Sequence, residues 1–252
     1  MTPDGRRQEI VAIVMREGSV QIDSLAERLD VSRMTVHRDL DLLEQQGLLR
    51  KERGMATAES SLLFESNFHY RIQVAAEDKQ ALAKAAAKLV EPGSVVMIDE
   101  STTTLPLADA LSGMEALTVI SNSLAVQERV RDLPNIRMLA PGGLYNAKQK
   151  AFYGLICEHS FGKLRADWAF LSSSSVIGTS LYHQEQEVIR VKRAIMDSAE
   201  RRVLLVTANK FSIRALNHYA ELAEFDHVFI KGPIDETIVS RLQQAGIHFE
   251  TI

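Results

Sequence analysis

Six side chains that could recognise nucleic-acid bases are predicted to gather at the start of one helix. A helix beginning near residue 33 would be capped by the first of them and would carry the others in its first two turns: Ser32, Arg33, Met34, Thr35, His37 and Arg38. Arginine can bind guanine through two hydrogen bonds, and a methionine or threonine methyl can contact the methyl group of thymine. In a helix-turn-helix, this half of the second helix enters the major groove. The spacing therefore predicts sequence recognition on double-stranded DNA.

Another face of the same helix is predicted to be buried. Val36, Leu40 and Leu43 follow the i, i+4, i+7 spacing of a core stripe. The hydroxyl group of a serine before the first turn can accept a hydrogen bond from a free backbone N–H. We expect the helix to continue to about Gln46, where Gly47 supplies a left-handed stop.

Two helices are expected ahead of this one. Apolar residues at one-face spacing predict a first helix from Gly5 to Arg16 and a short second helix within Val20–Leu29. The turn that follows contains Val31, which is expected to be buried between the two helices. A short helix, a tight turn and a further helix predict a helix-turn-helix. A three-helix interaction module with a solvated charged face is the alternative.

A small basic hairpin is expected next. The stretch Leu48–Gly54 carries three cations, Arg50, Lys51 and Arg53, which suit phosphate oxygens. Such contacts position a protein on DNA without reading its sequence. We therefore expect a winged helix-turn-helix domain at residues 1–57. Periodicity then fades from Met55 to about Phe68, and we expect a linker at residues 58–73.

The rest of the chain, residues 74–252, alternates helical and strand-like segments. Helices are expected at Lys79–Leu89, Leu105–Leu111, Leu124–Arg131 and about Glu185–Ala199. Strands are expected at Val95–Ile98, Leu117–Ile120, Ile136–Leu139, Trp168–Leu171, Val203–Val206 and His227–Ile230. Strands without polar alternation, separated by helices, predict a mostly parallel, doubly wound α/β domain covered on both faces.

Polar loops follow the first three of these strands. Ligands of such sheets bind beyond the carboxyl ends of the strands, and right-handed connections place these loops on one edge. Hydroxyl groups at a helix N-terminus, with a nearby lysine, suit a phosphate. The predicted ligand residues are Asp99, Ser101, Thr102, Thr103, Thr104, Ser121, Asn122, Ser123, Gly142, Gly143 and Lys210. For each loop alone, helix capping or a simple turn explains the residues equally well.

Composition excludes several classes of protein. The net charge is −4, and residues 1–57 carry nine Lys or Arg against ten Asp or Glu, so DNA binding depends on where the cations lie. A single cysteine, Cys157, excludes an internal disulfide framework and favours a reducing, cytoplasmic compartment. No apolar run approaches the roughly 18 residues of a membrane span. The histidines are scattered, so no metal site is expected. No cofactor is expected either.

The chain resembles the DeoR family of sugar-responsive transcription regulators, which are usually repressors. In the N-terminal part the resemblance rests on two motifs, Leu25-Ala26-x-x-Leu29-x-Val31-Ser32 and Thr35-Val36-x-Arg38-Asp39-Leu40. In the rest of the chain it rests on Arg71, Lys79, Asp99-x-Ser101-Thr102-Thr103, Thr118-x-x-Ser121-Asn122-Ser123, Gly142-Gly143, Gly154, Asp167-x-x-Phe170, Val191-Lys192-Arg193 and Lys210-Phe211.

The resemblance has several implications. It implies a C-terminal domain similar to ribose-5-phosphate isomerase and glucosamine-6-phosphate deaminase. It implies a phosphorylated-sugar effector that alters operator affinity, and a homodimer or homotetramer. The chain departs from the family pattern at Gly54-Met55, Ser101, Val188, Thr207 and Lys231, and three of these positions lie at or near the predicted pocket.

Two other functions are weighed against a repressor. An activator or dual regulator would carry the same motifs, because the sign of regulation depends on where the operator lies. A sugar-phosphate isomerase or deaminase with a DNA-binding head would need a positioned acid–base pair. Asp99, with Glu100 beside it, is the only acid placed firmly at the loops, and none of the three loops contains a histidine. We therefore expect no enzyme activity.

Overall fold

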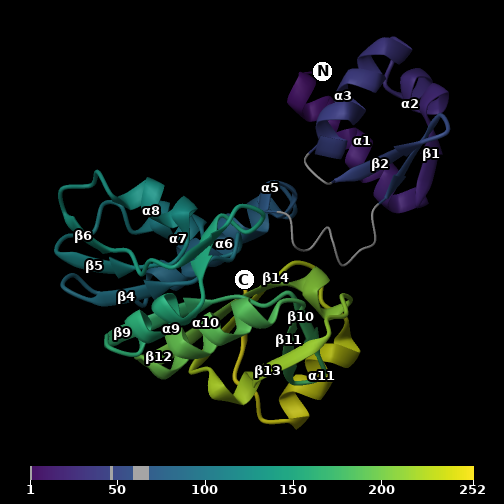
Figure 1. Cartoon of the computed structure of the whole chain (residues 1–252). Coiled ribbons are helices and arrows are strands. Elements are labelled where there is room, and N and C mark those ends of the chain that lie inside the picture. Colours follow the sequence, from purple (N-terminus) through teal and green to yellow (C-terminus); the bar gives the residue numbers. More distant parts are fainter. Residues whose placement is uncertain (1, 46–47, 59–67) are drawn as a thin grey trace. The chain divides into compact units, whose positions relative to one another are not determined.

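The structure, a computed structural model, describes residues 2–45, 48–58 and 68–252 (Figure 1). The chain divides into two compact units, residues 1–71 and 72–252. Each unit is built around its own cluster of buried apolar side chains. We call them the N-terminal unit and the C-terminal unit.

Three helices form most of the N-terminal unit: α1 (Pro3–Glu17), α2 (Ile22–Arg28) and α3 (Arg33–Gln45). The Thr2 hydroxyl caps α1 by accepting from the Gly5 N–H at 3.2 Å. The predicted inner stripe of α3 is confirmed, since its three apolar residues are 0–3% exposed. The predicted stop at Gly47 lies outside the described residues.

A three-stranded antiparallel sheet completes the N-terminal unit, in the order β1-β3-β2 (β1 Ser19–Gln21, β2 Leu49–Glu52, β3 Met55–Ala58). Arg53 and Gly54 connect β2 and β3 with φ of 48° and 80°, as a two-residue hairpin turn requires. A β-hairpin is therefore present where the wing was predicted, but its second strand extends beyond Gly54.

Two expectations about these segments are wrong. Val20 and Gln21 belong to β1 rather than to the second helix, and Met55–Ala58 is a strand rather than the start of an irregular segment. The reason is tertiary pairing, because β3 bonds to both neighbouring strands and buries Ala56 in the core. Within the predicted linker, residues 59–67 lie outside the description, and α5 (Phe68–Arg71) is helical. The domain limits remain a prediction.

A seven-stranded parallel sheet forms the centre of the C-terminal unit, in the order β6-β5-β4-β9-β12-β14-β15. Its strands are β4 (Val95–Ile98), β5 (Leu117–Ile120), β6 (Ile136–Leu139), β9 (Ala166–Leu171), β12 (Ala199–Thr207), β14 (His227–Lys231) and β15 (Glu250–Thr251). The predicted parallel, doubly wound sheet is confirmed, with β15 as an additional edge strand. The strand order reverses between β4 and β9, where sheets of this kind usually bind ligands.

Helices cover both faces of this sheet (Figure 1). Along one face α6 (Ala76–Ala87), α7 (Pro106–Ala110) and α8 (Leu124–Val130) pack in succession, and on the other α9 (Leu155–Phe161) packs against α10 (Gln186–Asp197). A further helix, α11 (Glu236–Gln244), precedes β15. The predicted helices are confirmed within a few residues at each end.

Several short elements were not predicted. They are the hairpin β7 (Leu144–Asn146) and β8 (Ala151–Tyr153), a second antiparallel sheet of β10 (Ser175–Ile177), β11 (Ser180–His183) and β13 (Asn217–Glu221), and the 3₁₀ turns η1 (Ala208–Phe211) and η2 (Leu222–Glu224). Unlike the central strands, these short strands are not continuous apolar runs, and three to five residues are too few to show a clear period in the sequence. Among the described residues, no helix is both long and apolar enough to cross a membrane.

Candidate functional site

The start of α3 has the local structure that its sequence predicts. The Ser32 Oγ accepts a hydrogen bond from the Thr35 N–H at 3.2 Å and lies 2.9 Å from the Thr35 hydroxyl. This cap satisfies one of the free N–H groups of the first turn. The turn between α2 and α3 is tied to α2 by the Val31 N–H, which donates to the Ala26 carbonyl at 3.1 Å.

The predicted base-contacting side chains project from this turn. Met34 is 64% exposed and the side chain of Arg33 is 66% exposed, while Arg38 is exposed and Thr35 and His37 are half-buried. Arg33 Nε lies 2.5 Å from Asp23 Oδ1, but a pair this exposed contributes little to stability. These side chains are therefore available to a partner.

The residue next to Arg38 has a different role. Asp39 is 3% exposed and accepts from Arg6 Nε at 2.6 Å and from Arg7 at 3.5 Å. It thus joins α3 to α1 from inside the unit. Sequence reasoning did not assign this role, although an acidic residue on the apolar side of the helix was a visible signal.

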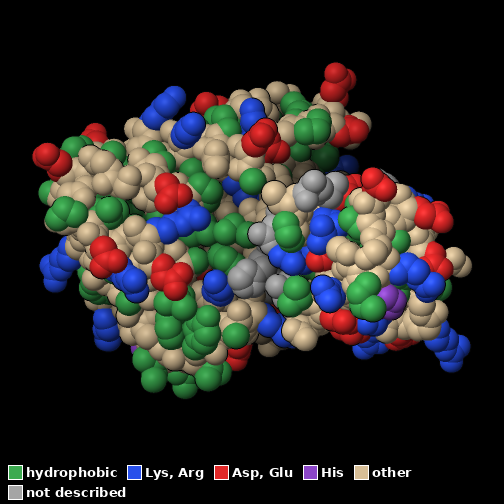
Figure 2. Space-filling view, turned by 90° about the horizontal axis from the view of Figure 1, so that it is seen from above, with side chains coloured by type: hydrophobic (Ala, Val, Ile, Leu, Met, Phe, Trp, Pro, Cys, Tyr) green, Lys and Arg blue, Asp and Glu red, His purple; other side chains and the backbone are tan. Residues whose placement is uncertain are grey.

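Two of the three wing cations lie beside acidic side chains. The Lys51 side chain pairs with Asp41, and its backbone N–H donates to Glu44 Oε1 at 2.8 Å. The Arg50 Nη1 atom lies 3.9 Å from Glu52 Oε1, and Arg53 is exposed in the turn between β2 and β3. Acidic and basic side chains are interspersed over the face seen in Figure 2, so no single basic surface dominates it.

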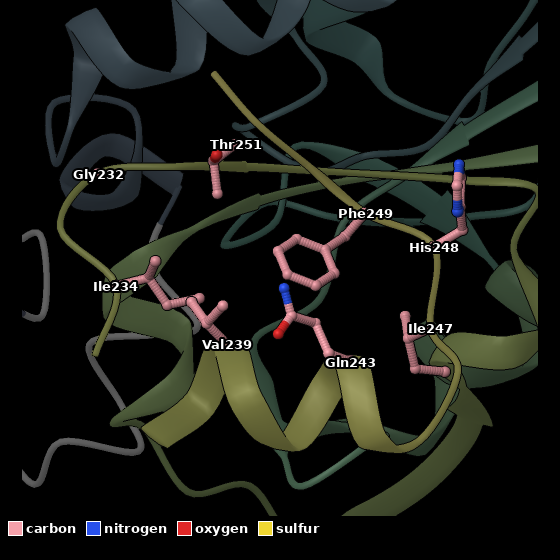
Figure 3. Close-up of a pocket in the computed structure, with 8 residues that line it drawn as sticks. All are labelled: Gly232, Ile234, Val239, Gln243, Ile247, His248, Phe249 and Thr251. Atoms are coloured by element: carbon pink, nitrogen blue, oxygen red, sulfur yellow. The ribbon is translucent and has the colours of Figure 1, made fainter. Parts of the chain in front are cut away.

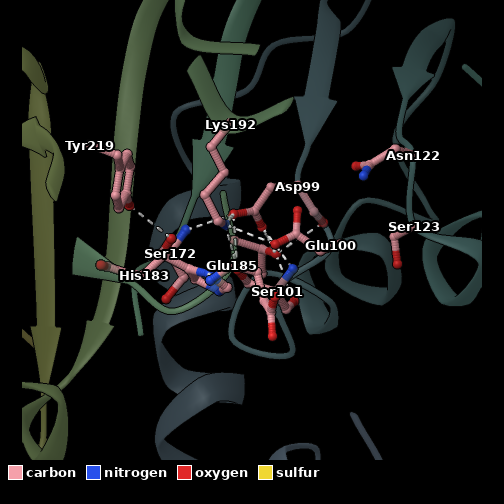
Figure 4. Close-up of polar contacts among 12 residues, drawn as sticks. Asp99, Glu100, Ser101, Asn122, Ser123, Ser172, His183, Glu185, Lys192 and Tyr219 are labelled. Atoms are coloured by element: carbon pink, nitrogen blue, oxygen red, sulfur yellow. Dashed lines mark hydrogen bonds and ion pairs between the residues drawn. The ribbon is translucent and has the colours of Figure 1, made fainter. Parts of the chain in front are cut away.

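At the point where the strand order reverses, one buried carboxylate organises the carboxyl edge of the sheet (Figure 4). Asp99, fully buried after β4, accepts from the Ser101 N–H at 3.0 Å, the Ser101 hydroxyl at 2.9 Å and the Thr104 hydroxyl at 2.6 Å. It also accepts from the Ser172 N–H at 2.9 Å, beyond β9, and pairs with the ammonium of Lys192 from α10. We call Asp99, Glu100, Ser101, Ser172 and Lys192 the Asp99 cluster.

The cluster holds two carboxylates and one ammonium away from water. Lys192 Nζ lies 3.1 Å from Glu100 Oε1 and donates to Ser101 Oγ at 3.0 Å. Burial lowers the pKa of Lys192, but the charges of Asp99 and Glu100 outweigh burial and hold that pKa above its usual value. Burial raises the pKa of Glu100, and only part of this rise is offset by Lys192.

Three polar atoms around the cluster make no hydrogen bond within the described part of the chain. They are Glu100 Oε2, Asn122 Oδ1 and Ser172 Oγ, and each belongs to a residue no more than 2% exposed. They come from loops after three neighbouring strands, β4, β5 and β9. Buried polar atoms without partners are uncommon and call for an explanation.

Much of the second predicted loop performs capping. Ser121 Oγ accepts from the Ser123 N–H at 3.1 Å, and Ser123 Oγ accepts from the Val126 N–H at 3.4 Å as the cap of α8. Asn122 Nδ2 donates to the Phe152 carbonyl at 3.0 Å. Capping therefore accounts for both serines. The Asn122 amide nitrogen is bonded, whereas its Oδ1 has no hydrogen-bond partner in the described part of the chain.

Of the two glycines of the third loop, Gly143 meets a steric requirement. Gly143 has φ of 143°, and a Cβ placed there would lie 2.4 Å from the Tyr153 carbonyl oxygen. Only glycine fits this close approach of two backbone segments. Gly142 is exposed and has no such neighbour.

Two buried lysines lie close to the carboxyl edge of the sheet. One is beside the Ser101–Thr104 loop, and the other follows β12. Lys79, 4% exposed on α6, donates to Thr102 Oγ1 at 3.1 Å, and Lys210, 9% exposed, lies in η1 just beyond β12. Thr103 and Thr104 are buried in the same loop as Thr102. The helix that follows, α7, has five residues and begins with Pro106, which has no N–H. It offers less support to a phosphate than the sequence suggested.

Comparisons with known proteins agree with this architecture. The family model of the DeoR-like helix-turn-helix domain matches residues 6–61, and that of the DeoR C-terminal sensor domain matches residues 74–231. The chain belongs to the DeoR family. It is a DNA-binding transcription regulator, and the predicted resemblance is confirmed.

Similar DeoR-family proteins match over nearly their whole length. The uncharacterized HTH-type transcriptional regulator YgbI of Escherichia coli (strain K12) is 33% identical over 94% of this chain and 93% of its own. The glycerol-3-phosphate regulon repressor of Haemophilus influenzae is 29% identical over 95% of this chain and 93% of its own length. The L-fucose operon activator of the same organism is 27% identical over 96% of this chain and 97% of its own length.

Solved structures add little to this assignment. A D-ribose-5-phosphate isomerase in complex with phospho-erythronic acid is 15% identical, with a TM-score of 0.41 over 54% of each chain. A likeness of this strength supports neither a shared fold nor a shared activity. The expected similarity to glucosamine-6-phosphate deaminase remains a prediction.

This DeoR-family chain also has a cavity of about 600 Å³ whose lining includes none of the predicted ligand residues (Figure 3). It is bordered by α11 and β15, with no Lys, Arg, Asp or Glu in its lining: Gly232, Ile234, Val239, Gln243, Ile247, His248, Phe249 and Thr251. Groups of three metal-ligating side chains do not occur among the residues described.

Lys192 is the main residue of the Asp99 cluster to which the sequence assigned no role. It was noted only as part of the DeoR resemblance, yet it lies on the buried stripe of α10 with Val188 and Val191. A lysine within an apolar stripe was a signal for a buried ion pair. Ser172 gave no such signal, because its part in the cluster is made mainly by its backbone N–H.

Proposed function

We propose that this regulator is a repressor of a carbohydrate-utilisation operon and that a phosphorylated sugar releases it from its operator. The observation that carries the proposal is the exposed amino-terminal half of α3. Arg33, Met34 and Arg38 project from a helix that is capped at Ser32 and braced at Asp39. An orientation held by the fold is what base recognition in the major groove requires.

The chemistry of the sheet edge supports a sugar phosphate as the effector. Hydroxyl groups of a sugar could donate to Glu100 Oε2 and Asn122 Oδ1, which have no partner in the described structure. Lys79 and Lys210 supply positive charge for a phosphate near the same edge. Asp99 already accepts five hydrogen bonds or ion-pair contacts, and we assign it to holding the loop rather than to direct ligand contact.

Calorimetry on the full chain would test the effector. A panel of sugar phosphates, the matching free sugars and inorganic phosphate are titrated separately, and only a phosphorylated sugar is expected to bind. Lys210→Glu is expected to abolish that binding. The matched control is Lys88→Glu, at an exposed position on the C-cap of α6, and it is expected to bind as the wild type does. Absence of binding by the wild type to every sugar phosphate would refute this part of the proposal.

The direction of regulation has a second candidate, because relatives named as a repressor and as an activator both match this chain. A promoter–reporter strain with and without the protein distinguishes them. Repression predicts higher reporter expression when the gene is deleted. Lower expression on deletion would favour an activator.

We further propose that the protein has no catalytic activity. A general base needs a carboxylate that can reach the substrate. Asp99 has both oxygens engaged inside the protein, and burial favours the neutral form of Glu100. Turnover of a sugar phosphate that is lost in Asp99→Asn, with binding retained, would overturn this.

A further inference from the structure

Glu100 uses one of its two carboxyl oxygens in the Asp99 cluster. Its side chain is buried, and its Oε1 lies 3.1 Å from Lys192 Nζ. Its Oε2 makes no hydrogen bond within the described part of the chain. A buried carboxyl oxygen of this kind is uncommon, and a ligand that donates a hydrogen bond to it would explain it.

Ser172 lies close to Glu100 through the same groups. Its N–H donates to Asp99 Oδ2 at 2.9 Å, and the Lys192 ammonium that pairs with this oxygen also lies beside Glu100 (Figure 4). The sheet agrees, since the two residues follow β9 and β4, which are neighbouring strands. The Ser172 hydroxyl is a second buried polar group that forms no hydrogen bond among the described residues.

The two oxygen atoms favour a ligand group with several donors. An ionised carboxyl group can only accept hydrogen bonds, and a serine hydroxyl can accept as well as donate. A sugar hydroxyl offers one donor, whereas a protonated amine offers three on a single nitrogen. One amine could therefore donate to both Glu100 and Ser172.

The charge of the cluster also favours an amine. Lys192 is shared by two carboxyl groups, those of Asp99 and Glu100, so one negative charge is in excess within the cluster when both are ionised. Burial raises the pKa of Glu100, and Lys192 offsets only part of this rise. A second positive charge beside Glu100 would favour its ionised form.

The surrounding groups fit the rest of a phosphorylated amino sugar. Asn122 Nδ2 donates to the Phe152 carbonyl, which fixes the amide so that Oδ1, unbonded in the described structure, can accept from a sugar hydroxyl. Lys79 and Lys210 supply positive charge for a phosphate near the same edge. An amine, hydroxyl groups and a phosphate on one small molecule therefore match the groups at this edge.

We propose that the effector is a phosphorylated amino sugar and that Glu100, with Ser172, binds its protonated amine. The proposal rests on the proposed function, because it names the kind of sugar phosphate that this edge binds. It goes beyond that function, since a neutral sugar phosphate would satisfy Glu100 with a hydroxyl group.

Calorimetry on the full chain with matched pairs of sugar phosphates tests the proposal. Glucosamine 6-phosphate and glucose 6-phosphate differ by an amine in place of one hydroxyl group, and the galactose and mannose pairs complete the panel. In at least one pair the amino member is expected to bind about 10- to 150-fold more tightly, the effect of hydrogen bonds to a charged group.

The same titrations separate this proposal from the proposed function. Equal or tighter binding of the hydroxyl member in every pair overturns the amine assignment and leaves a sugar-phosphate effector standing. Absence of binding by every sugar phosphate overturns both.

Glu100→Gln keeps the size of the side chain and removes its charge, so it is expected to bind both members of a pair equally. Glu91→Gln, at an exposed position before β4, is the matched control and is expected to keep the wild-type preference. Ser172→Ala retains the N–H that donates to Asp99 and is expected to weaken binding of the amino member alone. Cooperative thermal unfolding shows that the variants are folded. An undiminished preference in Glu100→Gln overturns the proposal.

A free monovalent cation is the other source of positive charge for Glu100. Melting temperatures of the wild type are compared in ammonium, potassium and choline chloride at one ionic strength, without sugar. The proposal predicts the same temperature in all three salts. A higher temperature in ammonium or potassium that is lost in Glu100→Gln would assign the position to a free ion and overturn the proposal.

Discussion

The start of α3 and the Asp99 cluster differ in how their polar groups are used. On α3, Arg33, Met34 and Arg38 are exposed and make few contacts within the protein. In the Asp99 cluster, two carboxylates and an ammonium are buried together. Side chains that contact a large partner such as DNA can stay exposed to solvent. A site for a small molecule needs its loops fixed by contacts within the protein. Substitutions should therefore affect binding in the first region and stability in the second.

The largest effect is expected from Lys192→Met. Removing the ammonium leaves the buried Asp99 carboxylate without its ion-pair partner, and breaking a buried ion pair costs about 3–5 kcal/mol. Urea unfolding followed by the fluorescence of Trp168, the single tryptophan, measures this loss in the C-terminal unit. Lys84→Met, at an exposed position on α6, is the control. A loss below about 1 kcal/mol for Lys192→Met would show that the cluster does not hold the edge together.

A smaller effect is expected from Asp39→Asn in the N-terminal unit. The substitution removes the charge that binds Arg6 and Arg7, and hydrogen bonds to charged groups contribute about 1.5–3 kcal/mol. Scanning calorimetry should show a lower melting temperature for this unit. Arg38→Ala, one residue away and exposed, is expected to leave that temperature unchanged. Equal losses from the two substitutions would remove the distinction between the two sides of α3.

The smallest effect concerns Glu100 and depends on pH. Burial raises its pKa above 4.5, so its protonated form contributes stability that is fully present below pH 4.5 and is lost as the pH rises through the folded pKa. Glu100→Gln imitates the protonated form. Its melting temperature relative to wild type should therefore rise with pH by a few degrees, since 1 kcal/mol shifts such a unit by ~2–4 °C. A difference that stays constant from pH 4 to pH 8 would contradict this assignment.

The sequence predicted α3 well because the information is local. Periodicity, a capping serine and a glycine beyond the helix are all readable within residues 32–47. The wing was predicted only in part, since β3 becomes a strand through pairing with β1, more than thirty residues earlier. The central strands were predicted because fully buried parallel strands are continuous apolar runs.

The Asp99 cluster could be predicted only in outline. The sheet topology places Asp99 and Asn122 on one edge, and the sequence predicted that. The ion pair between Asp99 and Lys192 joins residues 93 positions apart, and which residue on α10 reaches the edge depends on how that helix packs. The role of Gly143 likewise depends on Tyr153, which approaches through a hairpin that the sequence did not reveal.

Binding of the full chain to DNA tests the central claim most directly. A duplex selected from a random pool by the wild type is titrated at fixed salt with the wild type, Arg33→Ala, Arg38→Ala and the distant control Arg131→Ala. Arg33→Ala or Arg38→Ala is expected to weaken binding by about 1–3 kcal/mol, roughly 5- to 150-fold, with no change in melting temperature. Unchanged affinity in both variants would contradict the assignment of this face of α3 to the operator.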